Sequence, residues 1–442
     1  MPLHRIPFRI GLLCTALLAG QGQVWGQTAE PAPESWSLHG QATTVGQTHG
    51  DFPSPYQGPN SLRSNREWAT SFTTTLMTGW RLWKGAELYL DGEGAAGKGV
   101  SSVLGLAGAP NGETYRVGNP EFRAAVARAW VRQTFELGGD MQKVEADAHQ
   151  LGGFRDSRRV VLHAGKFSVM DVFDANTYAH DPRSQFLNWT LMGQGAWDYP
   201  ADTRGYTWGF AAEFYWDAWA FRYGRFAEPL EANQLEMDHG FARAHGDVVE
   251  LEHDHVIGDR PGAVRVMAYR NTTRMGDYRL SLAEVPAAPD ITATRAYGRV
   301  KQGWGLNLEQ ALTADLGAFA RWSWSDGHTE SWTFTEVDRS VSTGLSLKGG
   351  GWHRPQDRVG AAFVQNGLSA DHRDYLAAGG LGFLLGDGRL TYAPERICEA
   401  YYALALGRFL TASLDAQRIW NPGYNQDRGP VNLYALRLHA QF

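Results

Sequence analysis

Residues 434–442 read YALRLHAQF, a stretch in which apolar and polar side chains alternate. The even positions from Tyr434 to Phe442 are apolar, whereas Arg437, His439 and Gln441 are polar. Successive side chains of a β-strand point to opposite faces, so the stretch predicts a strand with one apolar and one polar face. Taken alone, this pattern fits a soluble sandwich as well as a membrane barrel.

The same alternation recurs along the chain, in residues 68–82, 206–214, 306–312, 318–324 and 410–416. Several of these stretches carry Trp or Tyr near one end, as the aromatic girdles at membrane interfaces require. Polar residues alternate with each apolar face, and a water-filled lumen explains them better than a dry core does. We therefore predict an all-β fold, a transmembrane antiparallel β-barrel whose first strand begins at Trp36.

The composition agrees with a membrane barrel. The 442-residue chain is 12% aromatic, contains 52 Gly, and has 47 acidic against 41 basic residues. The acidic balance argues against nucleic acid as a partner. After the first residues, no apolar run reaches the roughly 18 residues of a membrane helix. At roughly 25 residues per strand and connection, the chain accommodates about 16 strands, with 18 as the alternative.

The N-terminus is typical of an exported protein. Arg5 and Arg9 precede a short apolar run, and small residues precede Gln27, so residues 1–26 are predicted to be a signal peptide. Residues 27–35 are predicted to be a disordered lead-in, and residues 36–442 the barrel domain in the outer membrane. Cys14 lies in the predicted signal peptide, so Cys398 is left without an intramolecular disulfide partner.

Gly-, Pro- and Asp-rich stretches separate the predicted strands. Residues 50–65, 97–120, 283–294 and 375–394 are predicted to be long loops, and residues 82–86 a tight turn. Membrane barrels have short periplasmic turns and longer extracellular loops, some of which fold inward. We expect the same asymmetry here.

Motifs for other functions are incomplete. Gly92, Gly94 and Gly97 match a nucleotide-binding pattern, but the sequence that follows is loop-like rather than helical. His253 and His255 would share one face of a strand, yet no third ligand completes a metal site. The sequence contains neither the G-x-S-x-G motif of a nucleophile elbow nor the H-E-x-x-H motif of metalloproteases. We therefore predict no catalytic residues, no metal and no cofactor. A barrel hydrolase with scattered residues remains a less favoured alternative.

Parity within the strands predicts which side chains line the pore. In residues 127–135 the apolar Ala127, Ala129, Val131 and Phe135 would face lipid, which turns Arg128 and Arg132 inward. The same argument predicts further pore-lining residues: Glu213, Tyr215, Arg321, Glu399, Tyr401, Asp415, Gln417 and Arg437. Such donors, acceptors and aromatic faces suit sugars. Alternatively, they only keep the pore wet.

The C-terminal run NPGYNQDRGP at residues 421–430 and the final strand resemble the carbohydrate-selective porins, the OprB family. SPYQGPNSL at residues 54–62, and residues 165–167, 171–178 and 181–186, are similar to other parts of that family. The resemblance implies a 16-stranded barrel through which monosaccharides and small oligosaccharides diffuse passively. Polysaccharide export, or passage of other small polar solutes, is the alternative.

The resemblance also implies an inward-folded loop that narrows the pore, with these constriction residues: Asp171, Asp174, Asn176, Tyr178, Asp181 and Arg183. The implied partners are small sugars, outer-membrane lipid and lipopolysaccharide. The terminal Phe442 would be recognised by the barrel-assembly machinery. The sequence leaves the oligomeric state open between monomer and trimer.

Overall fold

A computed structural model describes residues 33–116 and 121–442. The predicted signal peptide, residues 1–26, lies outside the described residues, as does most of the predicted lead-in. Just before the first strand, the Glu34 amide donates to the Gly152 carbonyl (3.0 Å), and the Gly152 amide donates to the Glu34 carboxylate (2.8 Å). The chain is therefore already attached to the barrel at Glu34.

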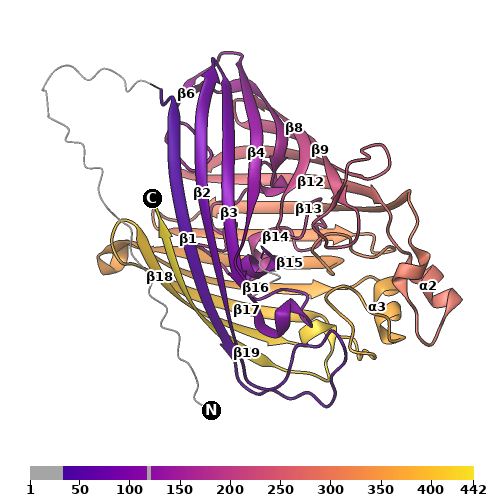
Figure 1. The fold of residues 1–442 in the computed structure, drawn as a ribbon. Helices are drawn as coiled ribbons and strands as arrows, with labels where there is room; N and C mark the ends of the chain where they lie inside the picture. Colours follow the sequence, from indigo (N-terminus) through magenta and orange to yellow (C-terminus); the bar gives the residue numbers. More distant parts are fainter. Residues whose placement is uncertain (1–32, 117–120) are drawn as a thin grey trace, which may run out of the picture. The chain divides into compact units, whose positions relative to one another are not determined.

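Within these described ranges, sixteen long strands form one closed antiparallel barrel (Figure 1). They are β1 (Trp36–His49), β2 (Glu67–Trp83), β3 (Ala86–Gly97), β4 (Arg123–Glu136), β7 (Arg158–Phe167), β8 (Thr207–Trp216), β9 (Trp219–Pro229), β11 (His245–Ile257), β12 (Arg260–Thr273), β13 (Arg299–Ala311), β14 (Leu316–Ser325), β15 (Arg339–Gly349), β16 (Arg354–Gly367), β17 (Glu395–Ala405), β18 (Leu410–Trp420) and β19 (Val431–Gln441). Each strand pairs with the next along the chain, and β1 pairs with β19 to close the ring. The first strand, β1, begins at Trp36, and the predicted sixteen-strand barrel is confirmed.

The alternation at the C-terminus sets the two faces of β19. Tyr434 is 57% exposed on the outward face, whereas Arg437 is 1% exposed on the inward face. Outward Trp36, Trp68 and Trp216 lie near strand ends, where aromatic side chains suit the membrane interface. The barrel wall is therefore apolar toward lipid and polar toward the lumen, as the sequence predicts.

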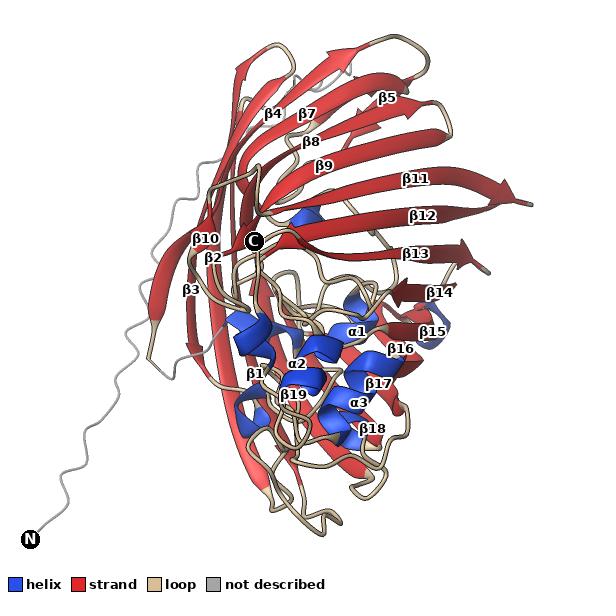
Figure 2. Ribbon diagram, turned by 90° about the vertical axis from the view of Figure 1, so that its right-hand side faces the viewer, coloured by secondary structure: helices blue, strands red, loops and turns tan. Residues whose placement is uncertain are grey.

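Connections at the two ends of the barrel differ in length. Short turns include residues 84–85, 217–218, 258–259 and 406–409, whereas the connections at the other end include residues 50–66, 98–122, 168–206 and 368–394. Short turns mark the periplasmic end. Figure 2 shows the helices gathered among the long connections.

The smaller elements lie in these connections. The helices are α1 (Trp189–Met192), α2 (Tyr278–Glu284) and α3 (Ala370–Ala377), the 3-10 segments η1 (Val100–Val103), η2 (Gly112–Arg116), η3 (Val169–Asp171), η4 (Ile291–Thr294), η5 (Gly350–Trp352) and η6 (Pro422–Tyr424), and the short strands β5 (Met141–Val144), β6 (Gly153–Asp156) and β10 (Met237–Asp238). In the part of the chain that is described, no helix is long and apolar enough to cross a membrane.

One periplasmic connection is longer than the others. Residues 137–157, here named the periplasmic ribbon, join β4 to β7 and contain the β5–β6 hairpin. Its tip turns into the barrel mouth, where Leu151 is buried and its amide donates to the Tyr89 hydroxyl on β3 (3.3 Å). The ribbon therefore lines part of the lumen from the periplasmic side.

The prediction that Ala127 faces lipid is wrong. The pairing of β3 with β4 shifts, so that Asp91 lies opposite Arg128 and Gly92 opposite Val126. This β-bulge leaves Ala127 as the extra residue, buried in the wall. Arg128 still faces the lumen, because side chains alternate regularly between the two faces of β4 from Arg128 onward.

Tyr206 also departs from the predicted apolar face of residues 206–214. It precedes β8 and is fully buried, and its hydroxyl donates to Glu93 on the inner wall (2.9 Å). The chain is still inside the lumen at Tyr206, and joins the wall only at Thr207. The alternation argument applies only from that point.

Candidate pore constriction

A long connection, residues 168–206, folds into the lumen and is here named the inward segment. It begins where β7 ends at Phe167, although β4 continues beyond the last β7 pairing, which joins Ala129 to Lys166. The chain therefore leaves the wall part-way along the barrel rather than at its rim. Nearly all residues between Phe186 and Met192 are buried, so this part of the segment fills the lumen rather than lying on the surface.

Asp171 attaches the start of the inward segment to β4. Its carboxylate accepts hydrogen bonds from Nε and Nη2 of Arg128, both at 2.7 Å, and from the Ser168 amide at 2.9 Å. Arg128 also pairs with Asp91 on β3 (3.1 Å). Burial alone would raise the pKa of Asp171, but the charge and hydrogen bonds of Arg128 more than offset this and lower the pKa to about 2.

Asp174 attaches the next residues to β13 and β14. It is fully buried in a left-handed conformation (φ 57°), which Asp tolerates better than most residues. Its carboxylate accepts from Nδ2 of Asn307 (2.6 Å), Nε of Arg321 (3.2 Å) and the Gln194 amide (2.8 Å). Asn176 donates to Oδ1 of Asn307 (2.8 Å). Asp171, Asp174 and Asn176 form what we name the near anchor.

The wall supplies the side chains that hold the middle of the segment. Glu399 on β17 accepts from the amides of Leu187 (2.5 Å) and Asn188 (3.0 Å). Arg437 on β19 donates to the carbonyls of Pro182 (2.6 Å) and Gln185 (2.7 Å). We name these contacts the far anchor. Here the inward segment contributes backbone groups, not charged side chains.

A second connection also enters the lumen. The amides of Ala107 and Gly108 donate to Glu395 on β17 (3.1 and 2.7 Å), and Gln417 on β18 donates to the Pro110 carbonyl (2.8 Å). The sequence predicts a long loop over residues 97–120 but not its inward position. The available signal was the parity of Glu395, which shares the inward face of β17 with Glu399.

The side of the inward segment away from its anchors keeps open surface. Tyr178 is half-buried against Gly317 on β14, where an added Cβ would lie 2.0 Å from the Tyr178 ring. The Thr177 amide donates to Glu309 on β13 (2.6 Å). Arg358 on β16 faces the same space, with no ion pair or side-chain hydrogen bond among the described residues. Hydroxyl, carboxylate and guanidinium groups thus surround the narrowed lumen.

Two constriction residues predicted from the sequence lie further along the segment. The Asp181 carboxylate accepts from the Arg183 amide (3.0 Å), and burial would raise its pKa, yet the charge of Arg183 keeps the pKa lowered. Arg183 itself bridges to Glu93 on β3 (3.1 Å) and to Glu113 in the second inward connection (3.2 Å). Both side chains retain partial exposure, so they can contact a solute.

A separate cluster lies toward the periplasmic end, away from the inward segment. Glu213 on β8 accepts from the Tyr215 hydroxyl (2.6 Å) and from Nε of Arg222 (2.9 Å), and lies 2.9 Å from Nε2 of His163. Arg132 pairs with Glu87 and donates to the His149 carbonyl of the periplasmic ribbon (3.0 Å). These predicted residues therefore line a different part of the lumen.

The sixteen predicted site residues thus fall into groups. Buried contacts that hold inward segments are made by Arg128, Asp174, Asn176, Arg321, Glu399, Gln417 and Arg437. Partly open surface remains at Asp171, Tyr178, Asp181, Arg183, Arg132 and Tyr215. Glu213 is buried in the periplasmic cluster, Tyr401 packs its ring against Phe186 (5.0 Å), and Asp415 accepts from Gln417 (3.1 Å).

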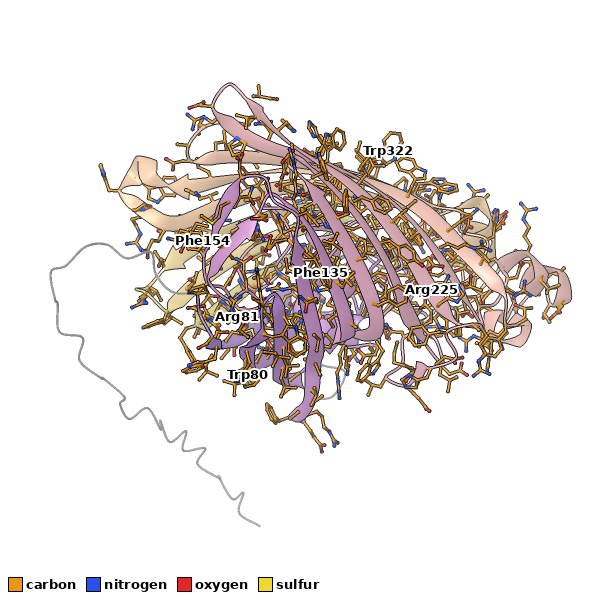
Figure 3. All side chains as sticks on the ribbon, turned by 90° about the horizontal axis from the view of Figure 1, so that it is seen from above. Trp80, Arg81, Phe135, Phe154, Arg225 and Trp322 are labelled. Atoms are coloured by element: carbon orange, nitrogen blue, oxygen red, sulfur yellow. The ribbon has the colours of Figure 1, made fainter. Side chains whose placement is uncertain are left out.

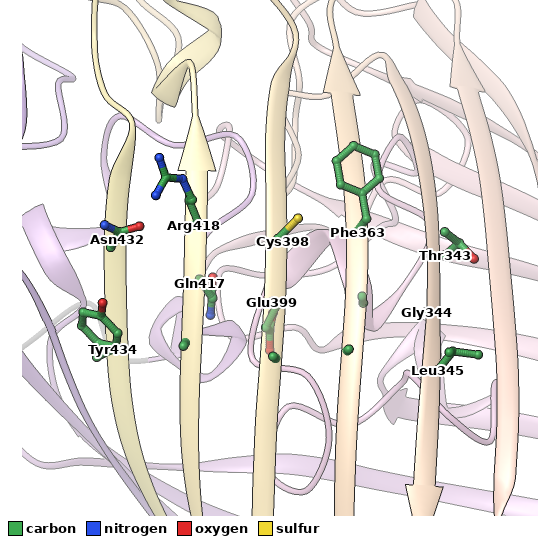
Figure 4. Close-up of a pocket in the computed structure, with 14 residues that line it drawn as sticks. Thr343, Gly344, Leu345, Phe363, Cys398, Glu399, Gln417, Arg418, Asn432 and Tyr434 are labelled. Carbon is green, nitrogen blue, oxygen red and sulfur yellow. The ribbon is translucent and has the colours of Figure 1, made fainter.

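Two other features lie on the outward face. His253 stacks on Trp219 (4.2 Å) near the periplasmic end, and His255 shares its face of β11. Among the described residues, no group of three or more His, Cys, Asp or Glu could hold a metal ion. A shallow groove of about 740 Å³ runs over β15 to β19 past Phe363, Cys398 and Tyr434 (Figure 4). It faces lipid, so it is separate from the solute path.

Comparisons with known proteins concern the family and the fold. The model of the family described as "Carbohydrate-selective porin, OprB family" matches residues 59–442. The high-pH structure of OprB from Pseudomonas putida matches with a TM-score of 0.69 at 17% identity, covering 92% of this chain and 94% of that chain. The outer-membrane channel DcaP of Acinetobacter baumannii matches with a TM-score of 0.49 at 9% identity, covering 95% and 100%. No curated protein sequence matches. At 17% identity, the OprB structure shows the shared barrel fold.

Proposed function

The chain belongs to the carbohydrate-selective porin family, and from this premise we propose that its constriction selects monosaccharides and small oligosaccharides. As a porin of this family, it lets carbohydrates diffuse passively across the outer membrane. We propose further that residues 1–26 direct export and that transport involves no hydrolysis. The selecting element in this proposal is the inward segment.

The observation that carries the proposal is the double attachment of the inward segment. Asp174 binds Arg321 on β14, and Glu399 on β17 binds the amides of Leu187 and Asn188. A segment held at two separate places along its length keeps a fixed opening, which a size-selective pore requires. A loop held at only one place would move aside for larger solutes.

The chemistry of the open side suits neutral sugars. Tyr178 offers an aromatic face, and Thr177, Glu309 and Arg358 offer a hydroxyl, a carboxylate and a guanidinium. Such groups replace water around sugar hydroxyls, while C–H groups of a sugar ring pack on an aromatic face. Several weak contacts of this kind favour entry without trapping the solute.

Liposome swelling with a series of sugars tests the proposal. The wild-type barrel should pass glucose faster than a disaccharide, and a trisaccharide more slowly still. Tyr178→Ala removes a ring that fills the opening beside Gly317. This variant should raise disaccharide entry by a larger factor than glucose entry, because the larger solute is limited more strongly by size.

Tyr434→Ala is the matched control, since Tyr434 faces lipid on β19. It makes the same chemical change without touching the lumen, so the sugar series should be unchanged. Absence of glucose entry in correctly folded wild-type liposomes would contradict the porin function. An equal effect of both variants would contradict the role of Tyr178 alone.

A further inference from the structure

A second cavity lies at the periplasmic mouth, between the periplasmic ribbon and the inner wall. We name this cavity, of about 710 Å³, the periplasmic vestibule. Its volume falls within the range of about 300–1,000 Å³ that is usual for small-molecule sites. Arg81 at the end of β2 and Phe154 on β6 both line it, and Figure 3 labels them. It is distinct from the constriction, which lies at the inward segment.

Positive charge prevails in the vestibule, although the whole chain has a formal net charge of −6. Among the described residues that line it, five are cationic: Arg81, Lys84, Arg132, Arg155 and Arg159. Three are acidic: Glu87, Glu136 and Glu213. The cavity therefore has an excess of two positive charges, unlike the chain as a whole.

The acidic side chains of the vestibule are already engaged. Glu87 pairs with Arg132 and Arg81 and accepts from the Tyr89 hydroxyl. Glu136 accepts from the Asp156 amide (2.7 Å). Glu213 is bound by His163, Arg222 and Tyr215, as described above. None of these three forms an ion pair with Arg155 or Arg159.

Arg159 is 4% exposed, yet it has no carboxylate partner among the described residues. Its guanidinium carbon lies 3.6 Å from the ring centroid of Tyr215, and Nη1 donates to the Asp156 carbonyl (2.9 Å). The guanidinium also makes a side-chain hydrogen bond with Tyr215. A buried cation without an anionic partner is costly, unless a bound anion completes it.

Arg155 lies on β6 of the ribbon, close enough to Arg159 for the two charges to repel each other. Its Nε atom is buried and has no hydrogen-bond partner. Arg155 likewise forms no ion pair within the described residues. These two adjacent guanidinium groups repel each other, and one of them has a buried donor without a partner. An anion between them is favoured, because one negative charge relieves the repulsion and accepts hydrogen bonds from both.

We propose that the periplasmic vestibule binds the anionic group of an acidic sugar, through Arg155 and Arg159. The carboxylate of a uronic acid accepts from both guanidinium groups, and its ring packs toward Phe154. The inference rests on the proposed porin function and adds a charged solute class to it. A neutral sugar passes the same vestibule but gains no ionic contact there.

Solute-induced block of single-channel current in planar bilayers tests the inference. Glucuronate added on the periplasmic side should block at a concentration roughly ten or more times lower than glucose, because it makes two charge-assisted contacts. The difference should shrink as salt rises, since salt screens ionic contacts and not neutral ones. Stronger block by glucose 6-phosphate than by glucuronate also supports the site, with phosphate as the preferred anion.

Arg155→Gln is the principal variant, because it lies on the ribbon rather than in the barrel wall. It should raise the blocking concentration of glucuronate roughly tenfold and leave that of glucose unchanged. Arg159→Gln should act in the same direction, and heat-dependent gel mobility checks that this buried change still folds. Arg158→Gln is the matched control, because Arg158 pairs with Asp217 in the β8–β9 turn (2.8 Å) and does not line the vestibule.

Equal block by glucuronate and glucose in the wild type would overturn the inference. So would a glucuronate block that Arg155→Gln leaves unchanged. Both results are compatible with a functioning neutral-sugar porin, since glucose entry in liposome swelling is measured separately. Loss of glucose entry in the wild type, by contrast, would contradict the proposed function itself.

Discussion

The near and far anchors hold the same inward segment by opposite means. At the near anchor, charged side chains of the segment, Asp171 and Asp174, reach out to arginines of the wall. At the far anchor, Glu399 and Arg437 of the wall reach in to backbone groups of the segment. The near anchor therefore depends on the sequence of the segment, and the far anchor on the sequence of the wall.

This difference predicts different sensitivity to substitution. Removing one partner of a buried charge pair leaves the other charge unpaired, which costs more than the pair itself contributes. Removing a side chain that binds backbone amides leaves neutral groups unsatisfied, which costs less. We therefore expect near-anchor changes to have the larger effects.

The largest effect is expected from Asp174→Asn. Arg321 is almost fully buried and would lose its only carboxylate partner among the described residues, which costs about 3–5 kcal/mol when a buried pair is broken. Urea unfolding of the barrel in liposomes, followed by tryptophan fluorescence, measures the loss. The matched control is Asp217→Asn, whose partner Arg158 lies at an exposed turn. Equal stability of the two variants would remove the distinction between the anchors.

A smaller effect is expected from Glu399→Gln at the far anchor. The amide oxygen still accepts one hydrogen bond, but the second carboxylate oxygen is replaced by an NH₂ donor. One of the two amides of Leu187 and Asn188 is then left unsatisfied, at a cost of about 1–3 kcal/mol. Hydrogen exchange at these two amides should accelerate, while the rest of the barrel keeps its protection. Cys398→Ala, one residue away on the lipid face, is the control. Unchanged exchange at Leu187 would contradict the assignment of the far anchor.

We expect acid to release the Asp171 contact of the near anchor only at low pH. The pKa of Asp171 is lowered to about 2, from an unfolded value of about 3.9. A lowered pKa stabilises the folded state above the unfolded pKa, and this stability is lost as pH falls through the folded value. Channel conductance should thus stay constant from pH 7 to about 4 and change only toward pH 2. A transition centred near pH 6 would show that another group controls the segment.

The smallest effect concerns a carboxylate that lies between strands β14 and β15 and binds backbone amides. Glu336 accepts from the amides of Leu384 and Leu385, like Glu399 at the far anchor, and it lies near His372 and Lys301. Burial raises its pKa to about 7, so its contribution to stability is complete below the unfolded pKa of about 4.3 and is lost as pH rises through 7.

Exchange at the Leu384 and Leu385 amides, corrected for intrinsic rates, should therefore be faster at pH 8 than at pH 6. Glu336→Gln should remove this dependence, because the amide does not titrate. A pH dependence that persists in the variant would show that Glu336 does not cause it.

The sequence predicts the barrel well because period-two alternation is a direct consequence of strand geometry. It fails at Ala127, where a bulge shifts parity, and at Tyr206, which lies inside the lumen. It also misses Arg358, since both faces of β16 are largely apolar between Val359 and Val364 and give no alternation to follow.

The residues of the candidate site that the sequence predicts also differ between the two anchors. Asp171, Asp174 and Asn176 were expected only through the resemblance to the OprB family, and the segment's own side chains make the contacts there. Parity also pointed to Glu399 and Arg437, but not to their partners, since backbone groups of any residue could accept or donate there. Only one residue, the inward-facing Glu395 on β17, indicated in advance that residues 98–116 fold into the lumen.

The inward segment also ties distant arcs of the barrel wall together. Asp171 is fixed to β4 and Asp174 to β14, which lie nearly opposite in the ring of strands, and Arg437 fixes the same segment to β19. A hollow cylinder under lateral pressure flattens into an ellipse, whereas a cross-member between opposite arcs resists that deformation. The pore should therefore keep its cross-section when membrane thickness or crowding changes.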